Sequence, residues 1–217
     1  MAQFAVIGLG RFGSTASREL MKMGHTVLGI DIDHKIVDKY ADELTQAVIA
    51  DVTEHNALAE LALENYDVVL VAIGSDFQAS LLCVVHLKSL GIEKIWVKAT
   101  SSAEHLILTK IGVTRIVHPE EEMGIRIAQA LSYPMVEDYI SLGNGEFIVE
   151  LTISQRLDGV PIQRITEGHE DVLHPLLLKR KTHLYPHPAA DFALQHNDTL
   201  IVAGPLATLR ALAPRLR

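Results

Sequence analysis

The segment from Phe4 to Gly13 constrains the fold of this chain more than any other. Four apolar or small residues lead into Gly-x-Gly-x-x-Gly, and a helix-like segment over residues 14–23 follows directly. Strand, glycine turn and helix in this order are typical of the phosphate-binding turn of a Rossmann βαβ unit. In such a turn Gly8 allows the tight bend, Gly10 lets the backbone approach a pyrophosphate, and Gly13 lets the helix pack close to the strand. The phosphates then face free N–H groups and the positive end of the helix dipole.

A second strand is predicted over residues 26–30, and it ends at Asp31. This carboxylate comes 23 residues after Gly8, close to the expected position of the acid that binds a ribose. A carboxylate here accepts hydrogen bonds from the 2′- and 3′-hydroxyls and repels a 2′-phosphate. The pattern therefore favours NAD or adenosine phosphates over NADP. The alternative is a fold that kept the turn and lost its ligand.

The next hundred residues alternate between strand-like and helix-like segments. Strands are predicted at 46–50, 67–73, 94–98 and 114–117, and helices at 33–43, 54–63, 77–90, 102–111 and from Pro119 onward. Thr53 is the expected N-cap of the third helix, and Ser75 or Asp76 that of the fourth. Six strands alternating with helices predict an α/β fold with a doubly wound parallel sheet, forming a nucleotide-binding domain over residues 1–135.

The predicted helix over residues 77–90 is apolar around most of its circumference. A surface helix shows a polar face, so we interpret this one as a subunit interface, with an internal core helix as the alternative. It contains Cys83, the only cysteine, which we expect to be a buried structural thiol. A single cysteine also excludes an internal disulfide.

Beyond Ser132-Tyr133-Pro134 the pattern changes. Gly143-Asn144-Gly145 separates two strand-like runs, 136–142 and 147–153, which is typical of a β-hairpin. A helical turn at 161–166, strands at 173–178, 182–184 and 198–204, and a helix at 206–212 complete the prediction. The strand predicted at 173–178 is interrupted by Pro175. We therefore expect a small α+β domain over residues 139–217, joined by a linker near residues 132–138.

Composition narrows the classes of partner. The net charge of −8 argues against general nucleic-acid binding, and the basic cluster Lys179-Arg180-Lys181 is interpreted as a solvated turn. No signal peptide is visible, and no apolar run reaches the roughly 18 residues that span a bilayer. We expect a soluble chain whose membrane role, if it has one, passes through a partner.

The carboxyl ends of the predicted parallel strands gather the polar residues where a doubly wound sheet binds its ligands. Asp51 is placed to meet an adenine amino group, with a simple helix N-cap as the alternative. Arg11 lies inside the glycine loop, where a guanidinium reaches an extra phosphate; the alternative is a solvated surface arginine.

Signatures of catalysis are missing from the sequence. Tyr-x-x-x-Lys, Gly-x-Ser-x-Gly, His-Glu-x-x-His and Cys-x-x-Cys do not occur. His183 and His187 are four residues apart, but Pro186 between them prevents a helical pair of zinc ligands. We therefore predict no catalytic residues, and nucleotide binding without chemistry.

Several motifs together resemble the RCK domain family, the regulators of potassium conductance. They are Val-Ile-Gly-Leu-Gly-Arg-Phe-Gly at 6–13, Asp31, Ala-Asp-Val-Thr at 50–53, Trp-Val-Lys-Ala at 96–99 and His-Pro-Glu at 118–120. The likeness is strongest to the cytosolic KtrA- and TrkA-type subunits of bacterial potassium uptake systems. It covers the whole chain: a nucleotide-binding N-terminal domain followed by a TrkA-C-type domain.

The resemblance implies a regulatory protein and not an enzyme. Subunits of this family form homodimers that assemble into a homo-octameric ring beneath a membrane potassium-translocating subunit of the KtrB or TrkH type. The expected location is the cytoplasm, at the inner face of the membrane. ATP and ADP bind in the N-terminal cleft, and NAD or NADH binding also occurs in the family. In some relatives the C-terminal domain binds cyclic di-AMP, but residues 139–217 contain no motif specific for it.

Carried onto this chain, the resemblance implies a role for each matching residue. Gly8, Gly10 and Gly13 hold the phosphates, Arg11 reaches the terminal phosphate, Asp31 holds the ribose and Asp51 faces the adenine. Glu120 matches an acid that binds a divalent or monovalent cation near the phosphates; the alternative is a residue that only complements the helix dipole. The full expected set is Gly8, Leu9, Gly10, Arg11, Phe12, Gly13, Asp31, Ile32, Asp33, Asp51, Val52, Thr53, Ile73, Gly74, Lys98 and Glu120.

Two other functions remain open at this point. The first is an NAD-dependent oxidoreductase that binds its cofactor in the same cleft. The second is an RCK-type regulator of another cation transporter or antiporter.

Overall fold

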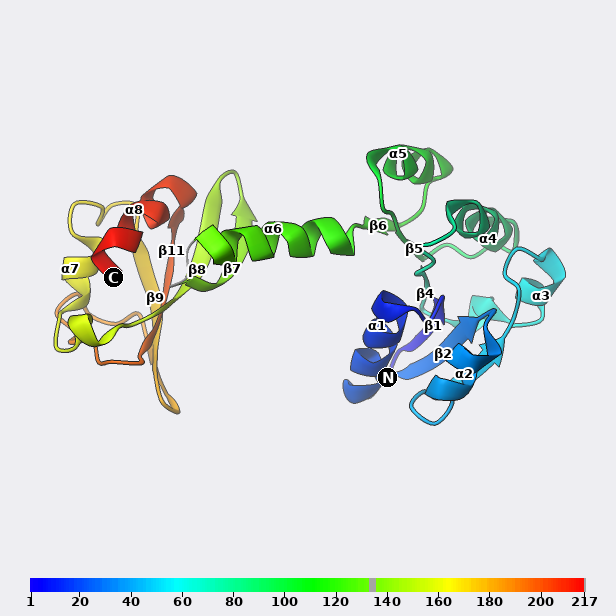
Figure 1. Cartoon of the computed structure of the whole chain (residues 1–217), viewed down its shortest axis with the longest axis horizontal. Helices are drawn as coiled ribbons and strands as arrows, with labels where there is room; N and C mark the ends of the chain where they lie inside the picture. Colours follow the sequence, from blue (N-terminus) through cyan, green and yellow to red (C-terminus); the bar gives the residue numbers. More distant parts are fainter. Residues whose placement is uncertain (133–135, 217) are drawn as a thin grey trace. The chain divides into compact units, whose positions relative to one another are not determined.

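The computed structural model describes residues 1–132 and 136–216, which form two compact units, Met1–Glu121 and Glu122–Arg217 (Figure 1). Each unit has its own sheet and its own apolar core. The change of pattern at Ser132-Tyr133-Pro134 and the centre of the predicted linker fall on residues 133–135, outside the described residues.

The N-terminal unit is built on a six-stranded parallel sheet with the order β3-β2-β1-β4-β5-β6. Its strands are β1 (Gln3–Ile7), β2 (Thr26–Asp31), β3 (Gln46–Ile49), β4 (Val68–Val71), β5 (Ile95–Lys98) and β6 (Arg115–Val117). The strand order reverses direction between β1 and β4, which are hydrogen-bonded neighbours. This confirms the doubly wound α/β fold and places the ligand crevice outside the carboxyl ends of these two strands.

Helices cover both faces of the sheet. They are α1 (Arg11–Lys22), α2 (His34–Tyr40), α3 (His55–Ala59), α4 (Phe77–Ser89) and α5 (Ser102–Ile111), with α6 (Pro119–Ser132) beginning at the end of the unit. Val6 and Val27 pack with Tyr40 of α2 on one face. Side chains alternate between the two faces of a strand, so Ile7 and Ile30 point to the other face. There they pack with buried residues of α4.

The segment after β3 differs from the prediction. Helix α3 has five residues instead of the ten predicted, because Ala62 adopts a left-handed conformation (φ 48°) and a short 3-10 turn, Leu63–Asn65, follows. Thr53 is not its N-cap: its N–H and hydroxyl both donate to Asp51, and Glu54 occupies the cap position without a side-chain hydrogen bond. The other predicted cap is confirmed, since Asp76 accepts the N–H of Ala79 at the start of α4.

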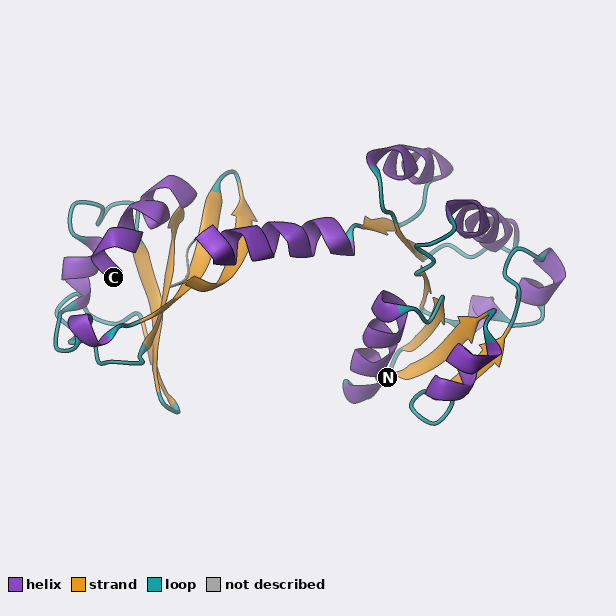
Figure 2. Ribbon diagram, in the orientation of Figure 1, coloured by secondary structure: helices purple, strands orange, loops and turns teal. Residues whose placement is uncertain are grey.

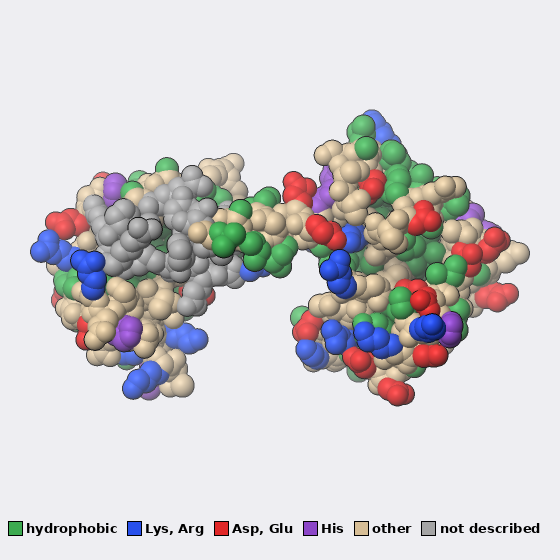
Figure 3. Space-filling model, in the orientation of Figure 1, with side chains coloured by type: hydrophobic (Ala, Val, Ile, Leu, Met, Phe, Trp, Pro, Cys, Tyr) green, Lys and Arg blue, Asp and Glu red, His purple; other side chains and the backbone are tan. Residues whose placement is uncertain are grey.

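Helix α4 has one buried face and one exposed apolar face. Cys83, Val84 and Leu87 are fully buried against the sheet, whereas Leu82 is 40 % and Val85 47 % exposed. The alternative of a fully internal core helix is therefore wrong within the described residues, and the subunit interface stays a prediction. Helix α5 also exposes Leu106, and hydrophobic side chains lie at the surface over α5 and α6 in Figure 3.

The C-terminal unit is a five-stranded antiparallel sheet with the order β10-β9-β11-β8-β7 (Figure 2). Its elements are β7 (Val136–Gly143), β8 (Glu146–Thr152), a 3-10 turn (Gln155–Leu157), α7 (Ile162–Thr166), β9 (His174–Arg180), β10 (His183–Pro186), β11 (Thr199–Pro205) and α8 (Leu206–Leu216). The predicted hairpin is confirmed, and its turn places Gly143, Asn144 and Gly145 at positive φ.

Pro175 does not interrupt β9 as predicted. The register between β9 and β11 shifts between Ile201 and Val202, where Val202 pairs with Pro175. An irregularity at this point lets the strand continue past a residue that lacks an N–H donor. The core of the unit lies between the sheet and its helices, and includes Leu151, Leu200 and Leu212.

In the part of the chain that the structure describes, no helix has both the length and the hydropathy needed to cross a bilayer.

Candidate functional site

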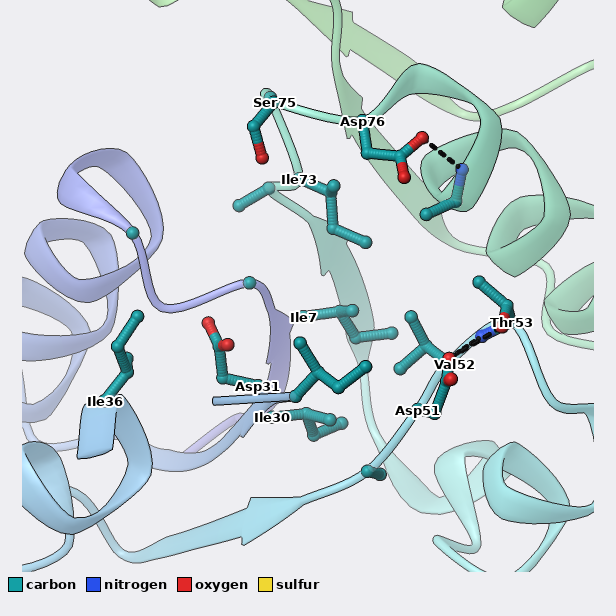
Figure 4. A pocket seen from close by; sticks show the side chains of 17 residues that line it. Ile7, Ile30, Asp31, Ile36, Asp51, Val52, Thr53, Ile73, Ser75 and Asp76 are labelled. Carbon is teal, nitrogen blue, oxygen red and sulfur yellow. Dashed lines mark hydrogen bonds between the residues drawn. The ribbon is translucent and has the colours of Figure 1, made fainter. Parts of the chain in front are cut away.

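A pocket of about 550 Å³ opens at the carboxyl ends of β1, β2, β3 and β4 (Figure 4). Four successive strand-end segments contribute its walls: the glycine turn, the turn after β2, the turn after β3 and the segment between β4 and α4. The lining residues are Ile7, Gly8, Gly10, Ile30, Asp31, Ile32, Ile36, Ala50, Asp51, Val52, Thr53, Ala72, Ile73, Gly74, Ser75, Asp76 and Ala79. The pocket lies at the expected crevice of the doubly wound sheet.

The three glycines of the turn are required for different reasons. Gly8 has a φ of +91°, and a Cβ there would lie 3.1 Å from the N of Ile73, so the turn itself needs glycine. A Cβ on Gly13 would lie 1.9 Å from the O of Gly8, so α1 approaches the turn only with glycine at this position. Gly10 has an ordinary φ of −60°, and a Cβ would meet nothing within 4 Å. The protein itself therefore does not require glycine at position 10.

Asp31 joins the glycine turn to the start of α2. Its Oδ2 accepts the N–H of Leu9 at 2.7 Å, and its Oδ1 accepts the N–H of Asp33 at 3.0 Å. Asp33 then caps α2 by accepting the N–H of Lys35 at 2.9 Å. A carboxylate oxygen has two lone pairs, so both Asp31 oxygens keep capacity to accept hydroxyl hydrogen bonds from the pocket.

Asp51 is held by the residue two positions further on. Its Oδ1 accepts the N–H of Thr53 at 3.0 Å and the Thr53 hydroxyl at 2.6 Å. These two hydrogen bonds, the hydroxyl first, lower the pKa of Asp51 below its ordinary value. Oδ2 accepts no hydrogen bond within the described residues. Because Glu54 is the N-cap of α3, the alternative role of Asp51 as a simple cap is wrong.

Three charged side chains lie near the glycine turn. Lys98, at the end of β5, is 9 % exposed, and its Nζ is 2.5 Å from Oε1 of Glu120. This hydrogen bond lowers the pKa of Glu120, and the charge of Arg11 contributes further. Arg11 is the exposed first residue of α1, and its guanidinium has no hydrogen bond or ion pair in the described chain.

Gly74 explains how Lys98 fits beside the pocket. Gly74 lines the pocket, and a Cβ there would lie 2.9 Å from Nζ of Lys98. The glycine therefore leaves room for the ammonium group of Lys98, which is not itself among the lining residues. The sequence showed both residues at strand ends but not this contact.

Nine of the sixteen predicted binding residues line the pocket: Gly8, Gly10, Asp31, Ile32, Asp51, Val52, Thr53, Ile73 and Gly74. The other seven, Leu9, Arg11, Phe12, Gly13, Asp33, Lys98 and Glu120, lie outside the lining. The side chains of Leu9 and Phe12 pack into the core on the α1 side of the sheet, so Leu9 faces the site only through its backbone.

Sequence reasoning missed some of the lining. Ser75 and Asp76 appeared only as helix caps, and Ile36 only within the helix predicted at 33–43, yet all three line the pocket. Ser75 and Asp76 follow the end of a strand, and Ile36 lies in the first turn of the next helix. These positions in the sequence could have predicted that they line the pocket.

Among residues 1–132 and 136–216, no three His, Cys, Asp or Glu side chains are grouped to hold a metal ion. Burial raises the pKa of the Cys83 thiol to about 12, so it is not a nucleophile. His105 and His118 bond to each other, Nδ1 to Nε2 at 2.8 Å, and so satisfy their facing nitrogens.

A family model for the TrkA-N domain matches residues 4–119, more than half of the chain. The chain belongs to the TrkA-N family. Its TrkA-N region comprises nearly all of the six-stranded sheet and every residue that lines the pocket.

Two curated relatives of this TrkA-N protein cover almost its whole length. It is 43 % identical over 202 residues to "Ktr system potassium uptake protein A" of Bacillus subtilis (strain 168), which is 93 % of this chain and 91 % of the relative. It is 36 % identical over 214 residues to "Ktr system potassium uptake protein C" of the same organism, 99 % of this chain and 97 % of the relative. Both names describe components of potassium uptake and not enzymes.

Solved structures extend the likeness to the C-terminal unit. The crystal structure of the GsuK RCK domain has a TM-score of 0.67 at 16 % identity, and covers 99 % of this chain and 47 % of that one. The GsuK channel bound to NAD has a TM-score of 0.61 at 16 % identity, covering 97 % and 38 %. At this identity the likeness shows the fold, which is that of RCK domains. This chain spans about half of the GsuK RCK chain.

Proposed function

We propose that this protein is the cytosolic regulatory subunit of a bacterial potassium uptake system, which binds an adenine nucleotide and thereby gates a membrane potassium-translocating subunit of the KtrB or TrkH type. The two relatives named as Ktr potassium uptake proteins support this, because they match the chain over both units. The structure of GsuK with NAD supports a nucleotide in a pocket of this fold.

The observation that carries the proposal is the open space at Gly10. Gly8 and Gly13 are required by the turn and by α1, but the conformation of Gly10 suits any residue and its Cβ would meet nothing. What glycine provides at this position is room for a ligand to reach the backbone. Since Gly10 lines the pocket at the N-terminus of α1, the ligand group that fits is a phosphate.

Each end of the pocket suits one part of an adenine nucleotide. The glycine turn and the first N–H groups of α1 hold the phosphates. Asp31 accepts the ribose hydroxyls, and the open Oδ2 of Asp51 accepts the adenine amino group. Ile32, Val52 and Ile73 supply apolar surface, and Asp33, Thr53 and Gly74 shape the turns beside them. Leu9 and Phe12 act through the backbone and the packing of the loop, and Lys98 through its pair with Glu120.

Arg11 and Glu120 are proposed to distinguish the ligands. ATP and ADP differ by one phosphate, and a ligand shifts a conformational equilibrium only by the difference in its affinity for the two states. Arg11 is exposed beside the glycine turn and has no hydrogen bond or ion pair in the described chain, so its guanidinium is available to bind the terminal phosphate. Glu120 is the proposed ligand of a cation that accompanies the phosphates, in exchange for its present contact with Lys98.

The exposed apolar surfaces support assembly. Helix α4 exposes Leu82 and Val85, α5 exposes Leu106, and α6 exposes Ile127 and Leu131. Apolar faces of this kind on successive helices are typical of protein interfaces. We propose homodimers that form an octameric ring, with residues 1–135 as the nucleotide-binding domain and residues 139–217 as the C-terminal domain. Cyclic di-AMP is the second ligand to test on the C-terminal domain.

The test is a competition binding assay with ATP, ADP, NADH and cyclic di-AMP, read beside the mass from light scattering. We expect ATP and ADP to bind with different affinities to a multi-subunit particle. Gly10→Val is the matched variant, because its Cβ lies within 4 Å of no protein atom and its side chain adds bulk at a residue that lines the pocket. It should keep its thermal unfolding midpoint and lose nucleotide binding.

Two results would overturn the proposal. Binding of NADH alone, with turnover in a redox screen, would identify an NAD-dependent oxidoreductase. Nucleotide binding together with co-purification of an antiporter or another cation transporter would keep the binding site and replace the partner.

A further inference from the structure

We propose that His86, on helix α4, is a positioning residue of this pocket, and that it holds the Asp51 carboxylate in the orientation that receives the adenine amino group. The inference rests on the proposed nucleotide-binding function and adds a residue that neither the sequence motifs nor the pocket lining contains. In this inference α4 supports the adenine end of the pocket, although the residues of that end, Asp51 and Thr53, belong to the segment after β3.

The contact is a hydrogen bond across 33 residues of sequence. Nε2 of His86 is 3.0 Å from the backbone O of Thr53. A carbonyl oxygen only accepts, so Nε2 must carry the hydrogen. That condition holds for one neutral tautomer of the imidazole and for the imidazolium, and the bond therefore persists in both charge states.

Thr53 is in turn hydrogen-bonded to Asp51. Its N–H and hydroxyl both donate to Oδ1 of Asp51, which leaves Oδ2 as the oxygen without a partner in the described chain. His86, Thr53 and Asp51 thus form a sequence of hydrogen bonds that begins in α4 and ends in the pocket. The orientation of the free oxygen follows from the position of Thr53.

The segment that carries Asp51 is anchored in the core by Val52, but the turn after Asp51 has few hydrogen bonds of its own. Helix α3, which follows it, has only five residues, and its N-cap Glu54 makes no side-chain hydrogen bond. The turn is closed locally by one backbone bond, from Glu54 N to Asp51 O at 3.2 Å. An anchor from a longer helix such as α4 lowers the entropy that binding would otherwise have to remove from this turn.

His55 is a natural control. Its ring packs edge-on against the ring of His86, with centroids 5.3 Å apart, and its Nδ1 is 3.5 Å from Oγ of Ser89. It therefore shares the surroundings of His86 but has no hydrogen bond to Thr53. Removing the His55 ring tests the packing of the pair, and removing the His86 ring tests the packing and the hydrogen bond.

The experiment measures ATP and GTP affinities by competition for the full-length chain and three variants: His86→Ala, His86→Gln and His55→Ala. Guanine has a carbonyl oxygen where adenine has its amino group, so Asp51 should favour ATP. Loss of one hydrogen bond of about 1 kcal/mol corresponds to roughly a fivefold change in affinity. We expect His86→Ala to weaken ATP binding about fivefold, to leave GTP binding unchanged and so to lower the ATP preference.

His86→Gln keeps an N–H donor at similar reach and should restore the ATP preference, and His55→Ala should keep it. Amide exchange at Thr53 and Glu54 should accelerate in His86→Ala alone, in the absence of nucleotide. Unaltered ATP affinity in His86→Ala would overturn the inference. So would an equal loss of ATP and GTP binding, or a glutamine variant that behaves like the alanine variant. If the unmodified chain binds neither nucleotide, the proposed function itself fails.

Discussion

Asp198 of the C-terminal unit differs from Asp31 and Asp51 of the N-terminal unit in burial and in bonding partners. In the C-terminal unit Asp198 is 1 % exposed, and both of its oxygens are occupied: Arg180 donates to Oδ1 at 2.9 Å and to Oδ2 at 2.8 Å, and the N–H of Gln195 donates to Oδ2 at 2.7 Å. In the N-terminal unit Asp31 and Asp51 lie at a pocket and accept only hydrogen bonds from nearby turns. Asp198 is therefore buried and paired with a cation, whereas Asp31 and Asp51 line a pocket and form no ion pair within the described residues.

Arg180 contacts several segments of the C-terminal unit. Besides its two bonds to Asp198, it donates to the O of Ala193 at 2.8 Å, and its guanidinium lies over the rings of Tyr185 and Phe192. It therefore ties β9 to three other segments. The interpretation of the basic cluster as a solvated turn is wrong for Arg180, because the side chain points into this network.

The largest expected effect follows from this network. Arg180→Met leaves the buried carboxylate of Asp198 without its cation, which typically costs about 3–5 kcal/mol. We expect the C-terminal unit to lose this much stability in chemical denaturation. Arg164→Met removes an ion pair of which both side chains are more than 60 % exposed, and should cost less than about 1 kcal/mol. Similar losses in the two variants would contradict the distinction between satisfied and exposed charges.

The second prediction separates Gly13, which the fold requires, from Gly10, whose proposed role is to leave room for a ligand. In Gly13→Ala the new Cβ meets the O of Gly8 at 1.9 Å, so α1 or the turn must shift, at a cost of about 1–3 kcal/mol or more. Gly10→Ala should change the free energy of unfolding by less than about 1 kcal/mol, because nothing lies near its Cβ. Calorimetric unfolding of both variants checks this. Equal destabilisation would show that Gly10 is also required by the fold.

The third prediction tests Asp31, the carboxylate proposed to bind the ribose. Asp31→Ala removes charged hydrogen bonds worth about 1.5–3 kcal/mol, so ATP affinity should fall roughly 10- to 150-fold in isothermal titration. The variant should remain folded, because Asp31 is only partly buried and water can reach the freed N–H groups of Leu9 and Asp33. An unchanged affinity would mean that Asp31 serves the turns alone, as Asp198 serves its own network.

The fourth prediction concerns discrimination between nucleotides. Arg11→Ala should bind both ATP and ADP, with the ratio of their affinities reduced toward one, because the proposed contact to the terminal phosphate is lost. Its stability should not change, since Arg11 is exposed and unpaired within the described chain. Equal affinities of ATP and ADP for the unmodified protein would count against a sensing role for Arg11.

The smallest effect is a shift in titration. Lys98 lowers the pKa of Glu120 below its ordinary value of 4.5, so the pair adds stability above that pH and loses it as the pH falls through the lowered pKa. In Lys98→Met the pKa of Glu120 should return toward 4.5, as followed by NMR of the carboxyl carbon, and this acid-dependent contribution should disappear. A pKa that stays low without Lys98 would assign the shift to the backbone hydrogen bond of Glu120 and to the charge of Arg11.

Local signals in the sequence determined the alternation of strands and helices, the glycine turn, the acid after the second strand and the Gly-Asn-Gly hairpin. Each depends on residues close together in the chain, through backbone conformation and hydrophobic periodicity. The misplaced Thr53 cap marks the limit of such signals: a capping side chain accepts a backbone N–H, whereas the Thr53 hydroxyl donates to Asp51 and Glu54 occupies the cap position.

Only the tertiary structure decided which side chains meet across those elements. His86 reaches Thr53, Gly74 makes room for Lys98, and Arg180 satisfies Asp198, each from a separate element of the chain. The same holds for Gly10, where the structure alone shows that the space beside the glycine is open. These contacts depend on packing distances of a few ångströms, which periodicity and spacing along a chain do not encode.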